Sequence, residues 1–173
     1  MPIETINFNG HIYPKFQSEG FASEIAFGIA NKILFGKGVD VGCNRVEWML
    51  PSTELRTVFP IDPVINGFDG LSFPKNYNNL DFIFSSHCLE HLPNWVDALN
   101  HWHNRLKVGG VVFLYLPDFS QEYWRNWNNR KHVHCFTPEI IGAYFKTQPN
   151  MWKNTFVSGV DLNNSFMLIS EKI

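Results

Sequence analysis

Two continuous apolar runs, LDFIFS at residues 80–85 and VVFLYL at residues 111–116, constrain the fold of this chain most strongly. A strand that is apolar at nearly every position suits the interior of a parallel sheet, where helices cover both faces. The apolar residues of segment 94–106, between the two runs, recur at helical spacing. This strand–helix–strand order predicts a parallel sheet with a right-handed crossover.

The same alternation of strand and helix patterns extends over most of the chain. Residues 1–17 are expected to be irregular, and residues 66–74 to hold at most a very short strand. Two last strands, at residues 155–162 and 165–171, flank an Asn-Asn pair and predict a closing antiparallel hairpin. The remaining helices are expected at residues 21–35, 45–50 and 138–145, and the remaining strands at residues 38–41 and 57–61.

These patterns predict a single α/β domain over residues 1–173, built as a three-layer, Rossmann-like fold. Its sheet would be mostly parallel, with an antiparallel strand added by the C-terminal hairpin. Residues 1–36 would form an N-terminal segment and helix, and residues 37–173 would form the core. A chain of 173 residues is long enough for one such core.

The composition excludes several classes of partner. A net charge of −2 gives no electrostatic reason to expect nucleic acid. The sequence contains no apolar run long enough to cross a bilayer, and its start does not resemble a signal peptide. Its three cysteines, an odd number without a C-x-x-C pattern, argue for free thiols. We therefore expect a cytoplasmic protein with no membrane partner, whose oligomeric state the sequence leaves open.

Acidic residues mark the ends of the first two predicted strands. Asp40 and Gly42 lie in the segment VDVGCN, and Asp62 follows Gly42 by 20 residues (62 − 42). A strand, a turn, a helix and a return strand bring both acids to the same edge of a parallel sheet, where a carboxylate can accept hydrogen bonds from a ribose diol. Because the turn lacks the G-x-G-x-x-G pattern, we expect a ligand with a ribose and no pyrophosphate.

Four segments carry a resemblance to one enzyme family. VDVGCN resembles the first motif of class I S-adenosylmethionine (SAM)-dependent methyltransferases, although Asn44 stands where a second glycine is common. Asparagine tolerates left-handed backbone angles better than most residues, so the turn is expected to survive. The segments SSHCLEHL, LKVGGVVFLYLPD and HVHCFTPEII resemble, in this order, three segments of methyltransferases of the type 11 group and of methyltransferase-like proteins of polysaccharide pathways.

The resemblance implies SAM as cofactor and methyl transfer to an oxygen or nitrogen of a small molecule or sugar. It also implies a seven-stranded sheet with a reversed last strand. Asp69 and Gly70 are assigned to the cofactor by a loose analogy, and an Asp-Gly pair also suits a simple turn. The expected cofactor-binding residues are Asp40, Gly42, Asn44, Asp62, Asp69, Gly70, Ser86 and His87.

The acceptor side of the site is expected to come from histidines and from the segment at residues 121–134. A hydroxyl acceptor benefits from a general base, and histidine titrates in a suitable range. His87 is the first candidate for this catalytic role, followed by His91 and His134. Aromatic and basic side chains of the segment could clasp a sugar or pack on the sheet as a surface helix; the candidates are Tyr123, Trp124, Arg125 and Trp127.

Two other hypotheses compete with the enzyme. Asn44 and the short chain also fit a methyltransferase-fold protein that acts as a non-catalytic binding or scaffold subunit. The segment HCLEH at residues 87–91 further matches the H-x-x-E-H pattern of inverted zinc peptidases, in which two histidines share a helix face. Because Pro93 would keep such a helix short, we expect no metal site. The alternative is that Glu90 with His91 holds a divalent ion that acidifies the acceptor.

Overall fold

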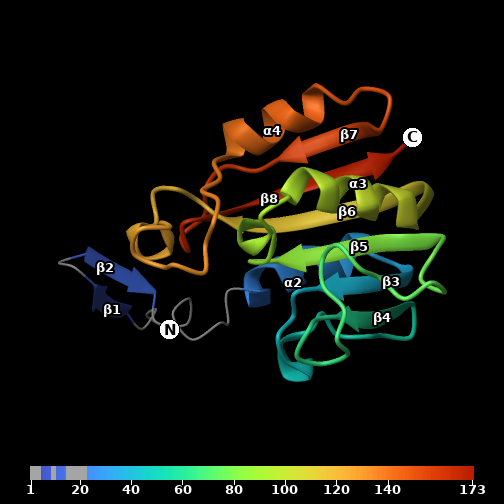
Figure 1. Cartoon of the computed structure of the whole chain (residues 1–173), viewed down its shortest axis with the longest axis horizontal. Helices are drawn as coiled ribbons and strands as arrows, with labels where there is room; N and C mark the ends of the chain where they lie inside the picture. The colour runs from blue at the N-terminus through green and yellow to red at the C-terminus, as the bar shows by residue number, and fades with distance from the viewer. Residues whose placement is uncertain (1–4, 9–10, 15–22) are drawn as a thin grey trace.

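The computed structural model describes residues 5–8, 11–14 and 23–173. Within this part of the chain, six strands form the main sheet in the order β4-β3-β5-β6-β8-β7 (Figure 1). Strands β3 to β6 are parallel, whereas β8 pairs antiparallel with both β6 and β7. The strands are β3 (Gly36–Val41), β4 (Arg56–Ile61), β5 (Leu80–Ser86), β6 (Leu106–Pro117), β7 (Trp152–Val157) and β8 (Ser165–Lys172).

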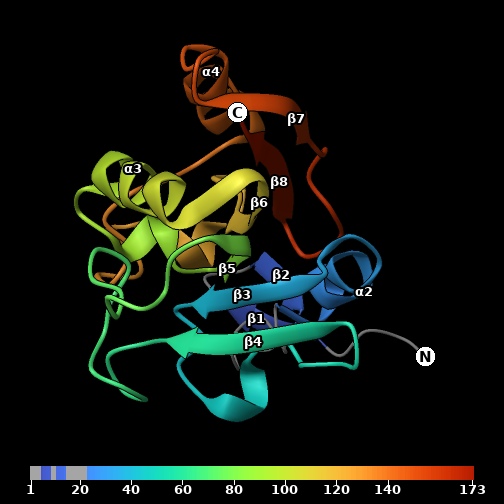
Figure 2. The ribbon, with the colours of Figure 1, turned by 90° about the vertical axis from the view of Figure 1, so that its right-hand side faces the viewer.

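Helices cover both faces of this sheet, which gives the three predicted layers. Figures 1 and 2 show α3 (Trp95–Arg105) and α4 (Pro138–Lys146) on one face and α2 (Ser23–Ile33) on the other. Successive strand residues point to opposite faces, so Ile83 packs with α3 while Phe82 and Phe84 pack with α2. This arrangement confirms the fold class expected from the sequence. Of the described helices, none combines the length and apolarity that crossing a membrane requires.

The N-terminal segment and the region after β4 differ from the sequence expectations. Strands β1 (Thr5–Phe8) and β2 (His11–Pro14) form an antiparallel pair, so the expectation of irregular structure was wrong there. The other residues of segment 1–17 lie outside the described part of the chain. Residues 62–79 are all described and contain turns but no strand, so the described main sheet has six strands rather than seven. Asn66 and Asp69 form hydrogen bonds to nearby backbone amides, which favours turns over a sheet ladder.

Several element boundaries also differ. The helix expected at residues 45–50 is only a 3₁₀ turn, η1 (Val46–Trp48), which ends shortly before Pro51. The helix expected to reach Phe35 ends at Ile33, and the helix expected to reach Leu106 ends at Arg105. The strand expected at residues 155–162 is β7, which begins and ends earlier. None of these changes affects the carboxyl ends of β3, β4, β5 and β6, which meet at one edge of the sheet.

Candidate active site

A cavity of about 390 Å³ lies at this edge of the sheet, and its volume suits a small-molecule ligand. Strands β3, β4 and β5 deliver Gly42, Asp62 and Ser86 to its wall. The structure thus brings together the whole set of residues predicted to bind the cofactor: Asp40, Gly42, Asn44, Asp62, Asp69, Gly70, Ser86 and His87 all line the cavity.

The turn after β3 has the backbone conformation that the motif requires. Gly42 has a φ of +83°, and Asn44 has a φ of +60°. The left-handed conformation expected of Asn44 is therefore confirmed. This conformation directs the Asn44 amide towards Asp62, and its N–H donates to Asp62 Oδ2 at 2.8 Å.

Asp62 is 5% exposed and faces the cavity from the end of β4. Its Oδ2 accepts from the Asn44 amide, and its Oδ1 accepts from the Val64 amide at 2.9 Å. A carboxylate oxygen has two lone pairs, so each oxygen can accept one more hydrogen bond. The carboxylate is therefore held in place by the backbone and keeps the capacity to bind a diol.

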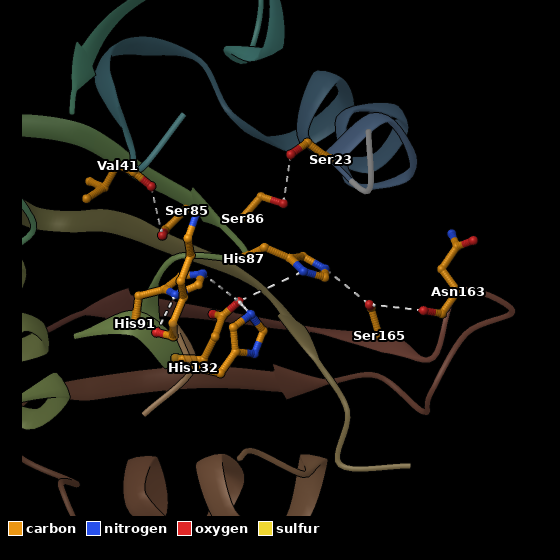
Figure 3. A network of polar contacts seen from close by, with 11 residues as sticks. Ser23, Val41, Ser85, Ser86, His87, His91, His132, Asn163 and Ser165 are labelled. Atoms are coloured by element: carbon orange, nitrogen blue, oxygen red, sulfur yellow. Dashed lines mark hydrogen bonds and ion pairs between the residues drawn. The ribbon is translucent and has the colours of Figure 1, made fainter. Parts of the chain in front are cut away.

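The end of β5 places Ser86 and His87 beside one another at the cavity. Figure 3 shows Ser23, from the start of α2, reaching Ser86; the Ser23 hydroxyl donates to Ser86 Oγ at 2.9 Å. His87 has a φ of +48°, a left-handed conformation that non-glycine residues adopt mainly where the surroundings enforce it. The His87 amide donates to Tyr115 O at 2.9 Å, which ties this turn to β6.

Of the three histidines predicted to be catalytic, the structure places His87 and His91 at the cavity. His134 is not among the lining residues, and its Nε2 is hydrogen-bonded to Pro93 O at 3.0 Å. The cavity is instead lined by His132, which is 3% exposed. Burial, with smaller effects from neighbouring histidines, lowers the pKa of His87 and the pKa of His132 each to about 3, so both rings are neutral at pH 7.

Comparison with known proteins decides the family. The family profile described as a methyltransferase domain matches residues 13–148. The chain belongs to this methyltransferase domain family. No protein of curated function matches the sequence. This family and the fold confirm the class I SAM-dependent methyltransferase expected from the sequence and, with it, SAM as the cofactor of the family. The likeness to polysaccharide-pathway proteins stays a prediction.

Solved structures of low sequence identity share this fold. The N-methyltransferase NodS from Bradyrhizobium japonicum, bound to S-adenosyl-L-homocysteine (SAH), is 13% identical over 91% of this chain and 88% of NodS, with a TM-score of 0.62. A SAM-dependent methyltransferase from Aquifex aeolicus is 12% identical, covering 92% of this chain and 97% of its own, with a TM-score of 0.64. The plantazolicin methyltransferase BpumL, also with SAH, is 11% identical over 91% and 84% of the two chains, with a TM-score of 0.61.

The aromatic segment of this methyltransferase is divided between the cavity and the surface. Trp124, in the 3₁₀ turn η3 (Glu122–Trp124), lines the cavity and stacks on His132 at an interplanar angle of 8°. Tyr123 packs edge-on against Trp124, with ring centroids 4.6 Å apart. Arg125 donates to Phe119 O, and Trp127 is 62% exposed. Among the four predicted acceptor-binding residues, Trp124 is therefore the one at the cavity wall.

Several lining residues carried no usable sequence signal. Ser23 comes from a helix that precedes the first motif, and Trp48 comes from η1. His132 could have been found, because it lies in the same H-V-H tripeptide as His134. The further lining residues that sequence reasoning missed are Cys43, Ile61, Pro63, Cys88 and Leu92, whereas Lys131 belongs to the basic side chains expected near the acceptor.

The helix required by the zinc-peptidase hypothesis does not form. Residues 87–91 are all described, and their helical part is the 3₁₀ turn η2 (Leu89–His91). The left-handed backbone of His87 excludes it from a right-handed helix, so His87 and His91 do not share an α-helical face. The segment belongs to the strand-end turn of a methyltransferase.

Replacing Gly42 with alanine is expected to destabilise the protein and to weaken SAM binding. A methyl group at this position would overlap Cys88 Sγ, and alanine disfavours the φ of +83°. We expect unfolding to become easier by about 2–4 kcal/mol, the sum of a backbone strain term and an overpacking term. Urea denaturation measures this change.

Gly67 provides the matched control, because it has a similar φ of +77° but open space around its Cα. Gly67→Ala should show the backbone term alone, about 1 kcal/mol. Equal losses in the two variants would show that the contact with Cys88 is unimportant.

Asp40 is expected to make stability fall as the pH rises. Burial raises the pKa of Asp40 to about 7; the Leu50 amide, which donates to Oδ2 at 2.7 Å, opposes this shift, and Asp62 adds to it. Between about pH 4 and pH 7 the folded state holds a proton that the unfolded state releases, so the free energy of unfolding decreases across this window.

Two buried thiols lie near Asp40. Burial is the main cause that raises the pKa of Cys43 and the pKa of Cys88, and the negative charge of Asp40 adds to both shifts.

Asp40→Asn keeps an oxygen for the Leu50 amide and removes the titration. Relative to wild type, this variant should gain up to a few kcal/mol between pH 4.5 and pH 7.5, at about 1.4 kcal/mol per pKa unit. Urea denaturation across this range measures the difference. Parallel pH profiles for the two proteins would contradict the assignment to Asp40.

Proposed function

We propose that this chain transfers a methyl group from SAM to an oxygen or nitrogen of a small-molecule or sugar acceptor. The observation that carries the proposal is the Asp62 carboxylate, held by two backbone amides at the cavity wall with acceptor capacity to spare for a ribose diol. The eight residues assigned to the cofactor share this cavity, which supports their proposed roles.

When bound, SAM supplies an activated methyl group on a sulfonium centre. The protein mainly has to align the acceptor atom, the methyl carbon and the sulfur, because positioning alone lowers the barrier substantially. Ser86 and His87, at the end of β5, are proposed to line the methyl group, since ligands of open α/β sheets bind beyond the carboxyl ends of the strands. Trp124 and His132 form the adjacent wall, where the acceptor would bind.

The class of acceptor is part of the proposal. NodS is described as an N-methyltransferase, and BpumL as a plantazolicin methyltransferase; these acceptors belong to those proteins. In this chain, Trp124 lines the cavity beside the buried His132, and its indole ring would contact a sugar or another ring bound there. The three cysteines are free, which supports the proposed cytoplasmic location. We also propose that the chain forms a single domain and that it binds neither nucleic acid nor a membrane.

Calorimetric titration with SAM and SAH tests the cofactor site. Binding at micromolar to submillimolar concentration is expected for both. Methyl-labelled SAM, incubated with panels of hydroxyl, amine and sugar acceptors, then tests transfer. Binding without transfer to any panel member would favour the non-catalytic scaffold; no binding at millimolar concentration would remove the enzyme proposal itself.

A further inference from the structure

Glu90 is a fully buried carboxylate surrounded by three histidines. Its exposed fraction is 0%, and its Oε1 lies 3.9 Å from His87 Nδ1, 3.8 Å from His91 Nε2 and 3.9 Å from His132 Nε2. Figure 3 shows the three labelled histidine rings facing a common centre, with dashed lines that converge between them. The three histidines line the cavity, so this cluster forms part of its wall.

Hydrogen bonds on the far side of the rings decide which nitrogens face Glu90 as lone pairs. His91 Nδ1 donates to Lys131 O at 2.8 Å, because a carbonyl can only accept. Ser165 Oγ donates to Asn163 O, so His87 Nε2 must donate to Ser165 Oγ at 3.2 Å. The remaining nitrogens, His87 Nδ1 and His91 Nε2, are therefore unprotonated in the neutral rings.

His132 follows the same arrangement. It is hydrogen-bonded to the Trp124 backbone, and its Nε2 points to Glu90. Outer hydrogen bonds of this kind fix the tautomer and orientation of histidines that bind metals. The cluster thus directs imidazole nitrogens towards the same carboxylate oxygen.

This arrangement lacks a positive charge at its centre. Separations of 3.8–3.9 Å are too long for hydrogen bonds. Apart from its own backbone amide, neither oxygen of the Glu90 carboxylate has a hydrogen-bond partner among the described residues. Burying an unpaired carboxylate is strongly unfavourable, and lone pairs that face one another repel. A cation between them would remove both penalties.

We propose that Glu90, His91 and His132 bind a divalent first-row transition metal ion of the Zn²⁺ type, with a fourth coordination position open towards the cavity. Their ligand atoms lie within 4.8 Å of one another. Two imidazoles and one carboxylate form a donor set that catalytic zinc sites use, with the fourth position left for water or substrate. Tetrahedral ligands about 2.05 Å from zinc are about 3.4 Å apart, so pairs of ligand atoms that are at most 4.8 Å apart would need to approach by up to about 1.4 Å.

The position of the ion indicates that it would activate the acceptor hydroxyl. This role rests on the proposed function as a methyltransferase. The ion would lie in the wall that Trp124 shares, beside the end of β5, where the acceptor is proposed to bind. A divalent ion lowers the pKa of a hydroxyl that binds to it. The proton of an acceptor hydroxyl would leave to solvent, and the oxygen electron pair would form the new carbon–oxygen bond. The carbon–sulfur bond of SAM breaks as this bond forms, and its electron pair stays on sulfur in SAH.

Glu90 also has a backbone role that must be separated from its side chain. Its carbonyl oxygen accepts from the amides of Val133 at 2.9 Å and His134 at 3.1 Å, which anchors the segment carrying His132. Substitution of the side chain leaves these bonds in place. Glu90→Gln preserves volume and is therefore the variant least expected to disturb the fold.

The test is calorimetric titration of chelator-treated protein with Zn²⁺, together with Co²⁺ absorption spectra that report the ligand geometry. We expect one ion per chain. Glu90→Gln and His132→Ala should each weaken Zn²⁺ binding by at least about 100-fold, since even outer partners of metal ligands contribute 10- to 100-fold. His134→Ala, in the same tripeptide but bonded to Pro93 O, should bind Zn²⁺ as wild type does.

SAM binding, measured on the same samples, separates the two proposals. Zn²⁺ binding without SAM binding would leave the metal site standing and remove the methyltransferase role. SAM binding without Zn²⁺ binding by wild type would overturn the metal site, and a shared proton would then stabilise Glu90. Wild-type affinity for Zn²⁺ in the folded Glu90→Gln and His132→Ala variants, checked by circular dichroism, would also overturn it.

Discussion

Asp62→Ala is expected to weaken the binding of SAM and SAH by about 100-fold. The carboxylate is held at the cavity wall by the Asn44 and Val64 amides and can accept two further hydrogen bonds. Hydrogen bonds to charged groups contribute about 1.5–3 kcal/mol each, and every 1.4 kcal/mol changes an affinity tenfold. Removing the acceptor of a ribose diol should therefore have a larger effect than removing any apolar contact in the cavity. Isothermal titration calorimetry measures the loss.

Two further variants identify the origin of this effect. Asp62→Asn keeps one acceptor oxygen and should lose about tenfold in affinity, since one charged hydrogen bond becomes a neutral one. Asp81 is the matched control: it accepts from the Lys37 amide at the opposite edge of the sheet. Asp81→Ala should leave the affinity for SAH unchanged. Similar losses for Asp62→Ala and Asp81→Ala would indicate a general effect on stability rather than ribose binding.

Trp102→Ala is expected to have the largest effect on stability. The Trp102 side chain is 0% exposed between α3 and the sheet, and its Nε1 donates to Gly70 O at 2.6 Å. Truncating a buried tryptophan costs about 3–5 kcal/mol, because it removes apolar contacts and leaves a cavity. The variant also removes the donor that holds Gly70 at the cofactor cavity. Urea denaturation followed by far-UV circular dichroism measures the change.

Trp127 offers the control for this substitution, because it is 62% exposed. Trp127→Ala should change the free energy of unfolding by no more than about 0.5 kcal/mol, the usual range for surface substitutions. A loss of less than about 1 kcal/mol in Trp102→Ala would contradict the buried position of this side chain. Destabilised Trp102→Ala that still binds SAH as wild type does would show that the bond to Gly70 is dispensable for the site.

Local sequence patterns predicted the strands well where one physical requirement dominated. The runs at residues 80–85 and 111–116 became β5 and β6, because a strand covered on both faces must be apolar throughout. Patterns were less informative where side chains bond to nearby backbone. Asn66 and Asp69 form such bonds, and residues 66–74, expected to hold at most a very short strand, form turns.

The sequence by itself determined that the first strands of the main sheet are parallel and which residues lie at their carboxyl ends. Because parallel strands align their carboxyl ends, Asp40, Asp62 and Ser86 had to meet at one edge. The conformation of Asn44 also followed from its own chemistry, since asparagine accepts left-handed angles.

Only the tertiary structure decided that Glu90 and His91 meet His132. These residues lie on separate segments, which are joined by the bonds of Val133 and His134 to the Glu90 carbonyl and of His91 to Lys131. Contacts between residues about 40 positions apart depend on how the loops pack over the folded sheet, and no local sequence pattern predicts them. The choice of His132 over His134 followed from this packing, which buries one ring beside Glu90 and turns the other towards Pro93.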